Sequence, residues 1–463
     1  MRLKKITLKN YRCFENLEID LHPRLTVLVG ENGSGKTSIL DAIASGLSPL
    51  LRYLSSADQR LSGPGIKDAD FRIEPLPGRG SKQRWGTTDY VQVAIETTSG
   101  MNWDNWRRSS ADKQQASKIG QTKLSDYAKS ILESFKTAFP EQLPILAYYG
   151  AQRGRIEIPE RLRPTNQEYS YPTAALVGAL DSQSDFKELL KWFDIEESTE
   201  LRVNKGCRPE EFELSVTLEA VRSAIESIFA KKYRNPYFNK DHKFVVEQED
   251  GMPLQVSQLS QGYQSMLALV MDFARRLAIG NGHLTFDELS RQLNQQSLFD
   301  IEIPDNLCSP CILAPGVMLI DEIDLHLHPS WQQRVIADLM RTFPNTQFIV
   351  TTHSPQVLST VHRDSIRLLG KDNNGQFITA KPIAESYGEL SSDVLESVMH
   401  VNPLPPVPEK ADLDHLTVLV DQGMYYTDEA QKLLERLRGV FGQSHPQLQK
   451  LMRSINRQEF LKS

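Results

Sequence analysis

Residues 25–54 carry the stretch LTVLVGENGSGKTSILDAIASGLSPLLRYL, in which an apolar run, a glycine-rich turn and a helical pattern follow one another directly. The run at 25–30 is typical of a buried strand, and the apolar spacing after Thr37 predicts a helix. The turn between them fits GxxxxGK[ST], whose glycines let backbone N–H groups surround phosphate oxygens at a helix N-terminus. The stretch therefore predicts a strand, a phosphate-binding loop and a helix.

Within this loop, two side chains have distinct expected roles. Lys36 is expected to reach the β- and γ-phosphates of ATP, and the Thr37 hydroxyl is expected to bind Mg²⁺. An ordinary glycine-rich turn is the alternative, but the strand before it and the helix after it argue against that interpretation. The nucleotide-binding residues predicted here are Gly30, Asn32, Gly33, Ser34, Gly35, Lys36, Thr37 and Ser38.

A second signal is the apolar run VMLI at 317–320, which ends in two carboxylates. Asp321, at the carboxyl end of the predicted strand, is placed to hold Mg²⁺ through water. Glu322 is placed to orient or deprotonate an attacking water. Two acids at a strand end are otherwise most often the start of a solvated loop. Their pairing with the phosphate loop favours the catalytic interpretation.

The order of the motifs is more specific than any one of them. Residues 259–264, LSQGYQ, resemble an ordinary helix start when taken alone. They follow the phosphate loop and precede the Asp-Glu strand, which is followed by DLHLHP at 324–329 and THSP at 352–355. This order resembles the ABC-type ATPase head. The N-terminal LKKITLKNYRCFENLEIDL is similar to the RecF and SMC branch of that family.

The resemblance implies roles for further residues. In the family, the signature motif, matched here by Ser260 and Gly262, closes on the γ-phosphate held by a second protomer, so ATP binding and dimerisation are coupled. Asp324 matches the D-loop at the dimer seam, and His353 matches the switch histidine that contacts the γ-phosphate. A core histidine that caps a helix is the alternative for His353.

Two further residues are expected near the nucleotide on shorter matches. Gln152, in AYYGAQRG, is the candidate for the Q-loop glutamine, which in the family senses Mg²⁺ and the attacking water. Arg12, in the KNYRCF turn, matches a position that approaches the nucleotide in related heads. A plain surface arginine is the alternative for Arg12.

The fold expected from these patterns is α/β: a P-loop ABC-type head with a mixed sheet, an antiparallel lobe and a helical lobe. Alternating runs predict strands near the N-terminus, and the polar, Gly- and Pro-rich residues 55–90 predict an insert or mobile loop. The expected divisions are a head at 1–400, with its core at 1–55 and 255–370 and an inserted region at about 55–255, and a C-terminal helical tail at 411–463.

Composition limits the class of protein. The net charge is −6, no run of 18 apolar residues occurs, and the N-terminus lacks the apolar core of a signal peptide. We therefore expect a cytoplasmic protein without a membrane partner. Four cysteines do not suit a disulfide framework. Cys308 and Cys311 form one CxxC, and a zinc site would need two more ligands, so the role of this pair stays open.

Basic residues are unevenly distributed. Residues 432–463 hold seven basic and two acidic side chains, a net charge of +5 that leaves −11 for the rest. This tail is a candidate for docking nucleic acid or an acidic partner, or is a solvated helical surface. A second group interleaves basic residues with tryptophans, as a nucleic-acid surface or as a sheet edge with tryptophans packed inward. Its members are Arg79, Lys82, Arg84, Trp85, Trp103, Trp106, Arg107 and Arg108.

The branch within the family follows from what is missing. The sequence has no long heptad pattern, as SMC proteins have, and no acidic DxD after the head, as nucleases with a Toprim domain have. The layout is similar to the PtuA family, the ATPases of Septu anti-phage systems and of some retrons, which act beside PtuB, an HNH nuclease. The resemblance implies an ATP-bound homodimer or higher oligomer that regulates a DNA-cutting partner. The alternatives are a RecF-like repair ATPase that binds DNA directly and a nucleotide-sensing scaffold with little hydrolysis.

Overall fold

The computed structural model describes the chain apart from residues 57–58, 77–83, 111–112, 114–118, 155–168, 170, 183–185, 285–308, 404–405 and 463. Contacts divide the chain into two compact units, Met1–Val394 and Leu395–Ser463. The division falls inside helix α11 (Ser391–Ser397), ahead of residue 400, where the sequence places the end of the head.

A six-stranded mixed sheet forms the centre of the first unit. Every strand in it is parallel to its neighbours except β15, which pairs antiparallel with β14. The inner strands β3 and β12 and the edge strand β8 are buried along their whole length and almost entirely apolar, as expected for a sheet covered on both faces. In sheet order the strands are β15 (Phe377–Ala380), β14 (Ile366–Lys371), β3 (Leu25–Val29), β13 (Thr346–Thr351), β12 (Gly316–Ile320) and β8 (Ile145–Tyr149).

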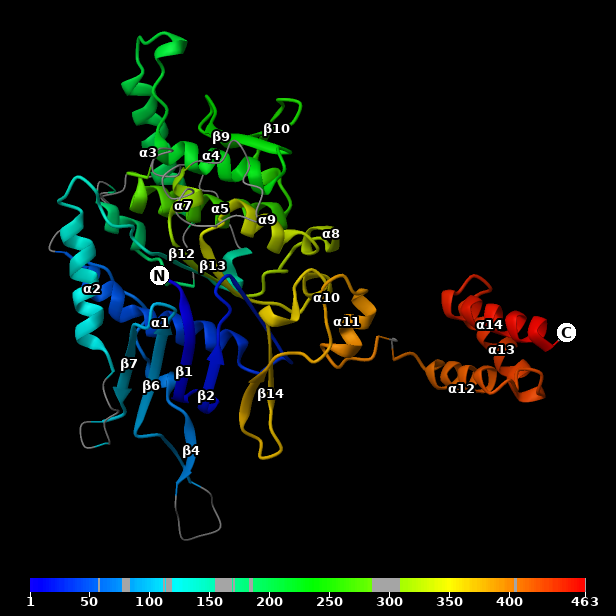
Figure 1. The fold of residues 1–463 in the computed structure, drawn as a ribbon. Coiled ribbons are helices and arrows are strands. Elements are labelled where there is room, and N and C mark those ends of the chain that lie inside the picture. The colour runs from blue at the N-terminus through cyan, green and yellow to red at the C-terminus, as the bar shows by residue number, and fades with distance from the viewer. Residues whose placement is uncertain are drawn as a thin grey trace. The chain divides into compact units, whose positions relative to one another are not determined.

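An antiparallel sheet of four strands lies beside the N-terminus, at the lower left of Figure 1. Helix α1 (Lys36–Leu54) contacts both this sheet and strand β13 of the mixed sheet. Gly46 permits the close approach, because a Cβ there would lie 2.8 Å from side-chain atoms of both Val93 and Ile95. The strands, in sheet order, are β2 (Phe14–Asp20), β1 (Leu3–Tyr11), β6 (Tyr90–Thr97) and β7 (Asn102–Arg108).

A helical layer covers the other end of the mixed sheet, near the top of Figure 1. The long helix α5 (Gln261–Asn281) contacts β8, and α4 (Val216–Ile228) packs along α5. The expected turn at Asp250-Gly251 joins β10 to β11. The remaining elements here are α3 (Phe186–Val203), β9 (Tyr233–Phe238), β10 (Phe244–Gln248), β11 (Pro253–Gln255), α7 (Ser309–Leu313) and α9 (Val335–Thr342).

Three segments differ from their sequence-based expectation. The polar stretch 55–90, expected as an insert or mobile loop, is not a loop throughout: it contains the paired strands β4 (Ile73–Leu76) and β5 (Arg84–Thr87), and the Ser48 hydroxyl of α1 donates to the Pro64 carbonyl. Residues 330–343 have apolar spacing that fits one helix, but they form α8 (Pro329–Gln332) and α9, separated by a turn at residues 333–334 where the Arg334 N–H donates to the Trp331 carbonyl. Residues 174–182 have a composition that favours a helix, but only a short 3-10 helix, Pro172–Leu176, forms there, and residues 177–182 are not helical.

The second unit contains three helices, α12 (Lys410–Asp421), α13 (Asp428–Phe441) and α14 (Pro446–Lys462), within the predicted helical tail. They share an apolar core formed by residues from each helix, including Leu416, Leu437 and Leu448. The Thr427 hydroxyl caps α13 by accepting a hydrogen bond from the Ala430 N–H. Among the described residues, no helix combines the length and the apolar character needed to span a membrane.

The basic and aromatic group predicted from the sequence is divided by the fold. Arg79 and Lys82 lie outside the described residues. Trp103 is fully buried, and its indole N–H donates to the Gly46 carbonyl at 2.8 Å, whereas Trp85 is 61% exposed. The inward-packed alternative therefore describes Trp103.

This packing predicts unequal effects for the two tryptophans. Trp103→Ala removes a large buried side chain between α1 and the antiparallel sheet, so we expect a loss of about 3–5 kcal/mol of stability. Trp85→Ala, the matched control on an exposed strand, should change stability by less than about 0.5 kcal/mol. Thermal unfolding followed by circular dichroism measures both. Equal melting temperatures for the two variants would contradict the assigned packing.

Candidate functional site

The phosphate loop occupies the turn between β3 and α1, at the carboxyl edge of the mixed sheet. Gly33 and Gly35 have φ values of 81° and 92°, in the left-handed region that favours glycine. At Gly35 a Cβ would also lie 2.4 Å from the ring of Phe14. The backbone path therefore requires glycine at Gly35 for two independent reasons. Because no side chain caps the N-terminus of α1, the backbone N–H groups of its first turn are available to bind an anion such as a phosphate.

Lys36 is buried beside this loop. Its ammonium donates to the carbonyls of Gly30 and Glu31 at 2.8 and 2.9 Å. Burial lowers the pKa of Lys36, and the nearby carboxylates of Asp321, Glu322 and Asp324 act in the opposite direction. A cation held against the loop's own carbonyls is in position to exchange them for phosphate oxygens.

Two of the three residues predicted at the Mg²⁺ site, Thr37 and Asp321, are in direct contact, and the third, Gln152, is described below. The Thr37 hydroxyl donates to the Asp321 carboxylate at 2.8 Å, across 284 positions of sequence. The other Asp321 oxygen accepts from the Thr351 hydroxyl at 2.6 Å. These contacts follow from strand order, because β3, β13 and β12 are adjacent and parallel and so end at the same edge. Paired hydroxyl and carboxylate oxygens fit Mg²⁺, which prefers oxygen ligands and retains water.

These residues line one cavity of about 390 Å³. Besides loop residues and Asp321, its walls include Glu322, His353 and Thr351, which come from the ends of β12 and β13. Sequence reasoning missed Thr351, although its place two residues before His353 in TTHSP is a usable signal. The predicted loop residues on the wall are Asn32, Gly33, Gly35, Lys36, Thr37 and Ser38.

The backbone at Glu322 is unusual. Its φ of 50° is left-handed, which for a non-glycine residue costs about 1–3 kcal/mol and is compensated only by its surroundings. The Glu322 N–H donates to the Thr351 hydroxyl at 2.7 Å. Its carbonyl accepts from the Arg153 guanidinium at 2.6 Å, and the same guanidinium also binds the Asp321 carbonyl. Burial lowers the pKa of Arg153 to about 10, so the guanidinium stays protonated at neutral pH.

Gln152 and Arg153 belong to one short turn, Ala151–Gly154, directly after β8. Gln152 is exposed and is not among the residues that line the cavity, whereas its neighbour Arg153 is buried against the end of β12. The structure therefore places the predicted Q-loop glutamine near this edge of the sheet but does not bring its side chain to the phosphate loop.

Asp324 and His353 are brought together. The Asp324 carboxylate accepts from the Thr352 hydroxyl at 2.5 Å and from the His353 N–H at 3.3 Å. Ser354, and not His353, caps helix α10 (Pro355–Leu358), since the Ser354 hydroxyl accepts from the Val357 N–H. The histidine ring is thus left on the cavity wall rather than used as a helix cap.

Arg12 lines the cavity too, but its guanidinium is engaged. It forms ion pairs with Asp41 at 2.8 Å and with Asp70 at 2.9 Å, and donates to the Ser38 hydroxyl at 3.2 Å. Burial acts to lower the pKa of Arg12, and Tyr11 and these carboxylates more than offset it, so the pKa lies above its ordinary value. Arg12 is therefore part of an ion-pair network rather than a plain surface arginine.

The signature residues lie outside this cavity. Ser260 is exposed at the N-terminus of α5, where its side chain makes no capping bond. Gly262 packs on the D-loop: a Cβ there would lie 2.4 Å from the His326 carbonyl oxygen. The next residue, Tyr263, contacts Trp331 of α8 with ring centroids 4.7 Å apart and stacks on Phe229 at 5.8 Å. The signature helix and the D-loop are thus packed on each other within one chain.

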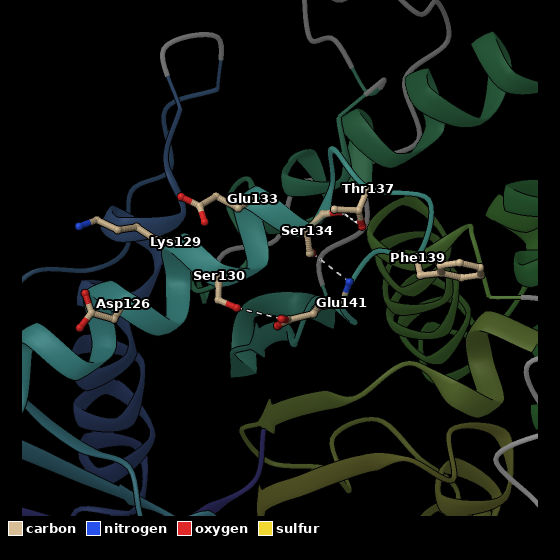
Figure 2. Close-up of a pocket in the computed structure, with 8 residues that line it drawn as sticks. All are labelled: Asp126, Lys129, Ser130, Glu133, Ser134, Thr137, Phe139 and Glu141. Atoms are coloured by element: carbon tan, nitrogen blue, oxygen red, sulfur yellow. Dashed lines mark hydrogen bonds between the residues drawn. The ribbon is translucent and has the colours of Figure 1, made fainter.

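Other features lie apart from the phosphate loop. Figure 2 shows a cavity of about 540 Å³ along α2 (Gln121–Ser134), where Ser130 bonds to Glu141 at 2.8 Å. None of the predicted site residues lines it. Cys308 lies outside the described residues, and Cys311 is buried. The described part of the chain holds no cluster of three or more His, Cys, Asp or Glu side chains arranged for a metal ion.

The geometry predicts the effect of removing the loop cation. Lys36→Ala should weaken ATP binding by at least about ten-fold, because one of the charge-assisted phosphate contacts is lost. Lys9→Ala, which removes an exposed lysine from β1, is the control and should bind ATP as the native chain does. Equilibrium dialysis with labelled ATP measures both affinities. Native affinity in Lys36→Ala would refute the assignment of the phosphate loop.

Comparison with known proteins agrees with this site. Residues 5–234 match the AAA domain family. The Retron Ec83 probable ATPase of Escherichia coli is 29% identical over 99% of this chain and 87% of its own length. The Retron Vc95 probable ATPase of Vibrio cholerae serotype O1 biovar El Tor is 28% identical over 88% of this chain and 80% of its own. The Septu protein PtuA of Bacillus mycoides (strain KBAB4) is 29% identical over 35% of this chain and 19% of its own. These matches show that the chain is an ATPase that is similar to the retron ATPases over most of its length and to Septu PtuA over about a third of it.

Proposed function

We propose that this ATPase is the regulatory subunit of an anti-phage defence assembly, in which ATP joins two copies of the chain and their state controls a nuclease partner. The observation that carries the proposal is the division of the site. Lys36, Thr37 and Glu322 share one cavity, while Ser260 and Gly262 belong to a separate surface of the same chain. A second copy would have to supply the signature surface to complete each site.

The residues suggest the following division of chemical labour. The N–H groups of the phosphate loop and Lys36 bind the phosphates, and Thr37 and Asp321 hold Mg²⁺. Mg²⁺ would neutralise charge that develops on the phosphate oxygens. Glu322 orients the attacking water and accepts its proton, and His353 contacts the γ-phosphate from the end of β13. Asp324, bonded to the backbone N–H of His353, couples the D-loop to this histidine.

The defence role rests on the relatives. Two proteins that match most of the chain are named as retron ATPases, and a third, which matches about a third of it, is a Septu protein. The family resemblance that includes PtuA implies an HNH nuclease partner, and the DNA is cut by that partner. The second unit, with its exposed basic side chains, is the proposed docking element. ATP-dependent changes in the head would reach the nuclease through the assembly.

Mixing two inactive variants tests the composite site. Lys36→Ala removes the phosphate-loop cation, and Ser260→Arg blocks the signature surface. Each variant alone should hydrolyse ATP at a small fraction of the native rate, because each homodimer has two defective sites. A mixture forms heterodimers in which one site has both native residues, so activity should rise to about a quarter of native at equal mixing. Mixing that restores no hydrolysis would contradict the composite site.

A charge reversal tests the docking element. Truncation at Lys432 would remove part of the apolar core, including Leu437 and Leu448, so substitutions are preferable. Lys450→Glu, Arg453→Glu and Arg457→Glu together reverse three exposed charges on α14 and should abolish copurification with a nuclease encoded beside this chain's gene.

The control changes the net charge equally in the head. Lys205→Glu, Lys240→Glu and Lys243→Glu reverse three exposed charges of the first unit and should leave copurification unchanged. Retention of the nuclease by the α14 variant would exclude this basic face as the docking site. A neighbouring gene for a replication protein, and none for a nuclease, would contradict the defence assembly itself.

A further inference from the structure

We infer that Arg153 is a positioning residue for ATP hydrolysis: its guanidinium binds the carbonyls of Asp321 and Glu322 and so fixes the direction of the Glu322 carboxylate. This inference rests on the role of Glu322 proposed above. Neither the family match nor the motifs used in the sequence analysis give Arg153 a role.

The contacts of Arg153 are unusual for a buried cation. Its side chain is buried, and the three acceptors found for its guanidinium among the described residues are the carbonyls of Gly150, Asp321 and Glu322. Carbonyls compensate a buried charge less well than a carboxylate does. The shape of the guanidinium explains why an arginine is suited to this position, because its planar fork of N–H groups can bind two consecutive carbonyls at once.

The bound carbonyls belong to Asp321 and Glu322, whose backbone determines where their carboxylates point. Glu322 has a left-handed φ of 50°, and its own N–H is held from the other side by the Thr351 hydroxyl. Asp321 is held in the same way, since its N–H donates to the Tyr149 carbonyl at 2.9 Å. Arg153 therefore completes a clamp in which both peptide groups at the end of β12 are bonded on each side.

The clamp explains what removal of the guanidinium would change. Without it, the Glu322 carbonyl loses its partner and the strained φ can relax, which turns the carboxylate away from its place on the cavity wall. Arg153 forms no bond to the phosphate loop among the described residues, so ATP affinity does not depend on it. The expected signature is a fall in kcat with an unchanged dissociation constant for ATP.

Another buried arginine serves as a matched control. Arg367 of β14 is buried to a similar degree, and its guanidinium donates to the carbonyls of Asp20, Asp364 and Ile366. It is not among the residues that line the cavity. Arg153→Met and Arg367→Met both remove a buried guanidinium from carbonyl acceptors, but only the first affects Glu322.

The first experiment measures the melting temperature, the ATP dissociation constant and kcat per ATP-binding chain, for the full-length protein. Both Met variants should have a lower melting temperature than the native protein. Only Arg153→Met should show a lower kcat, by about ten-fold or more, and its ATP affinity should stay within about two-fold of native. Arg153→Lys keeps the charge without the fork, so it should recover melting temperature but not kcat. If Arg153→Met does not fold, Arg153→Lys decides alone. Native kcat in either folded Arg153 variant would overturn the inference.

The second experiment asks whether Arg153 acts through Glu322. The double variant Arg153→Met, Glu322→Gln should hydrolyse ATP no more slowly than Glu322→Gln alone, since the carboxylate to be positioned is already absent. Multiplied losses would refute the positioning role and leave the assignment of Glu322 standing. A native rate in Glu322→Gln alone would refute the assignment of Glu322 and the inference with it.

Discussion

The hydrogen bond from the Thr37 hydroxyl to the Asp321 carboxylate joins the two halves of the predicted catalytic edge, and the arrangement of the mixed sheet makes this bond possible. Thr37 follows β3, and Asp321 follows β12, with β13 between them. The Thr351 hydroxyl at the end of β13 donates to Asp321 and accepts from the Glu322 N–H, so all three strands end in one hydrogen-bonded network. A shift in the register of any of these strands would separate the phosphate loop from its acidic partners.

The sequence was informative where a function depends on a local pattern. The phosphate loop, the Asp-Glu strand and the histidine after β13 are each read from a few consecutive residues, and the α/β head with its antiparallel lobe follows from their order. The sequence was less informative where a tertiary contact decides which side chain faces the site or whether a segment is ordered. Gln152 and Arg153 are neighbours in one turn, and spacing alone cannot tell which side chain faces β12. The stretch 55–90 has the composition of a loop, yet the Pro64 carbonyl accepts a hydrogen bond from Ser48 of α1, and the Leu61 N–H donates to the Ser55 hydroxyl.

The packing of the signature helix on the D-loop links the surface proposed to meet a second copy to the predicted catalytic edge of the same chain. Gly262 lies against the His326 carbonyl, and Tyr263 lies against Trp331. Two residues before His326, Asp324 binds the His353 N–H. A set of contacts thus runs from the start of α5 through the D-loop to the wall of the cavity, and it offers a route by which the proposed contact with a second chain would reach His353.

Helix α1 has a thermodynamic consequence beyond its role in the site. Its first turn belongs to the phosphate loop, and its middle, at Gly46, packs against Val93, Ile95 and Trp103 of the antiparallel sheet. A ligand that binds only the folded loop lowers the population of every state in which α1 is displaced. Backbone amides of β6 and β7 would therefore exchange with solvent more slowly in the presence of ATP, although these strands do not line the phosphate cavity. Binding of ATP at the phosphate loop would thus change how often the antiparallel sheet, packed on the other part of α1, opens locally.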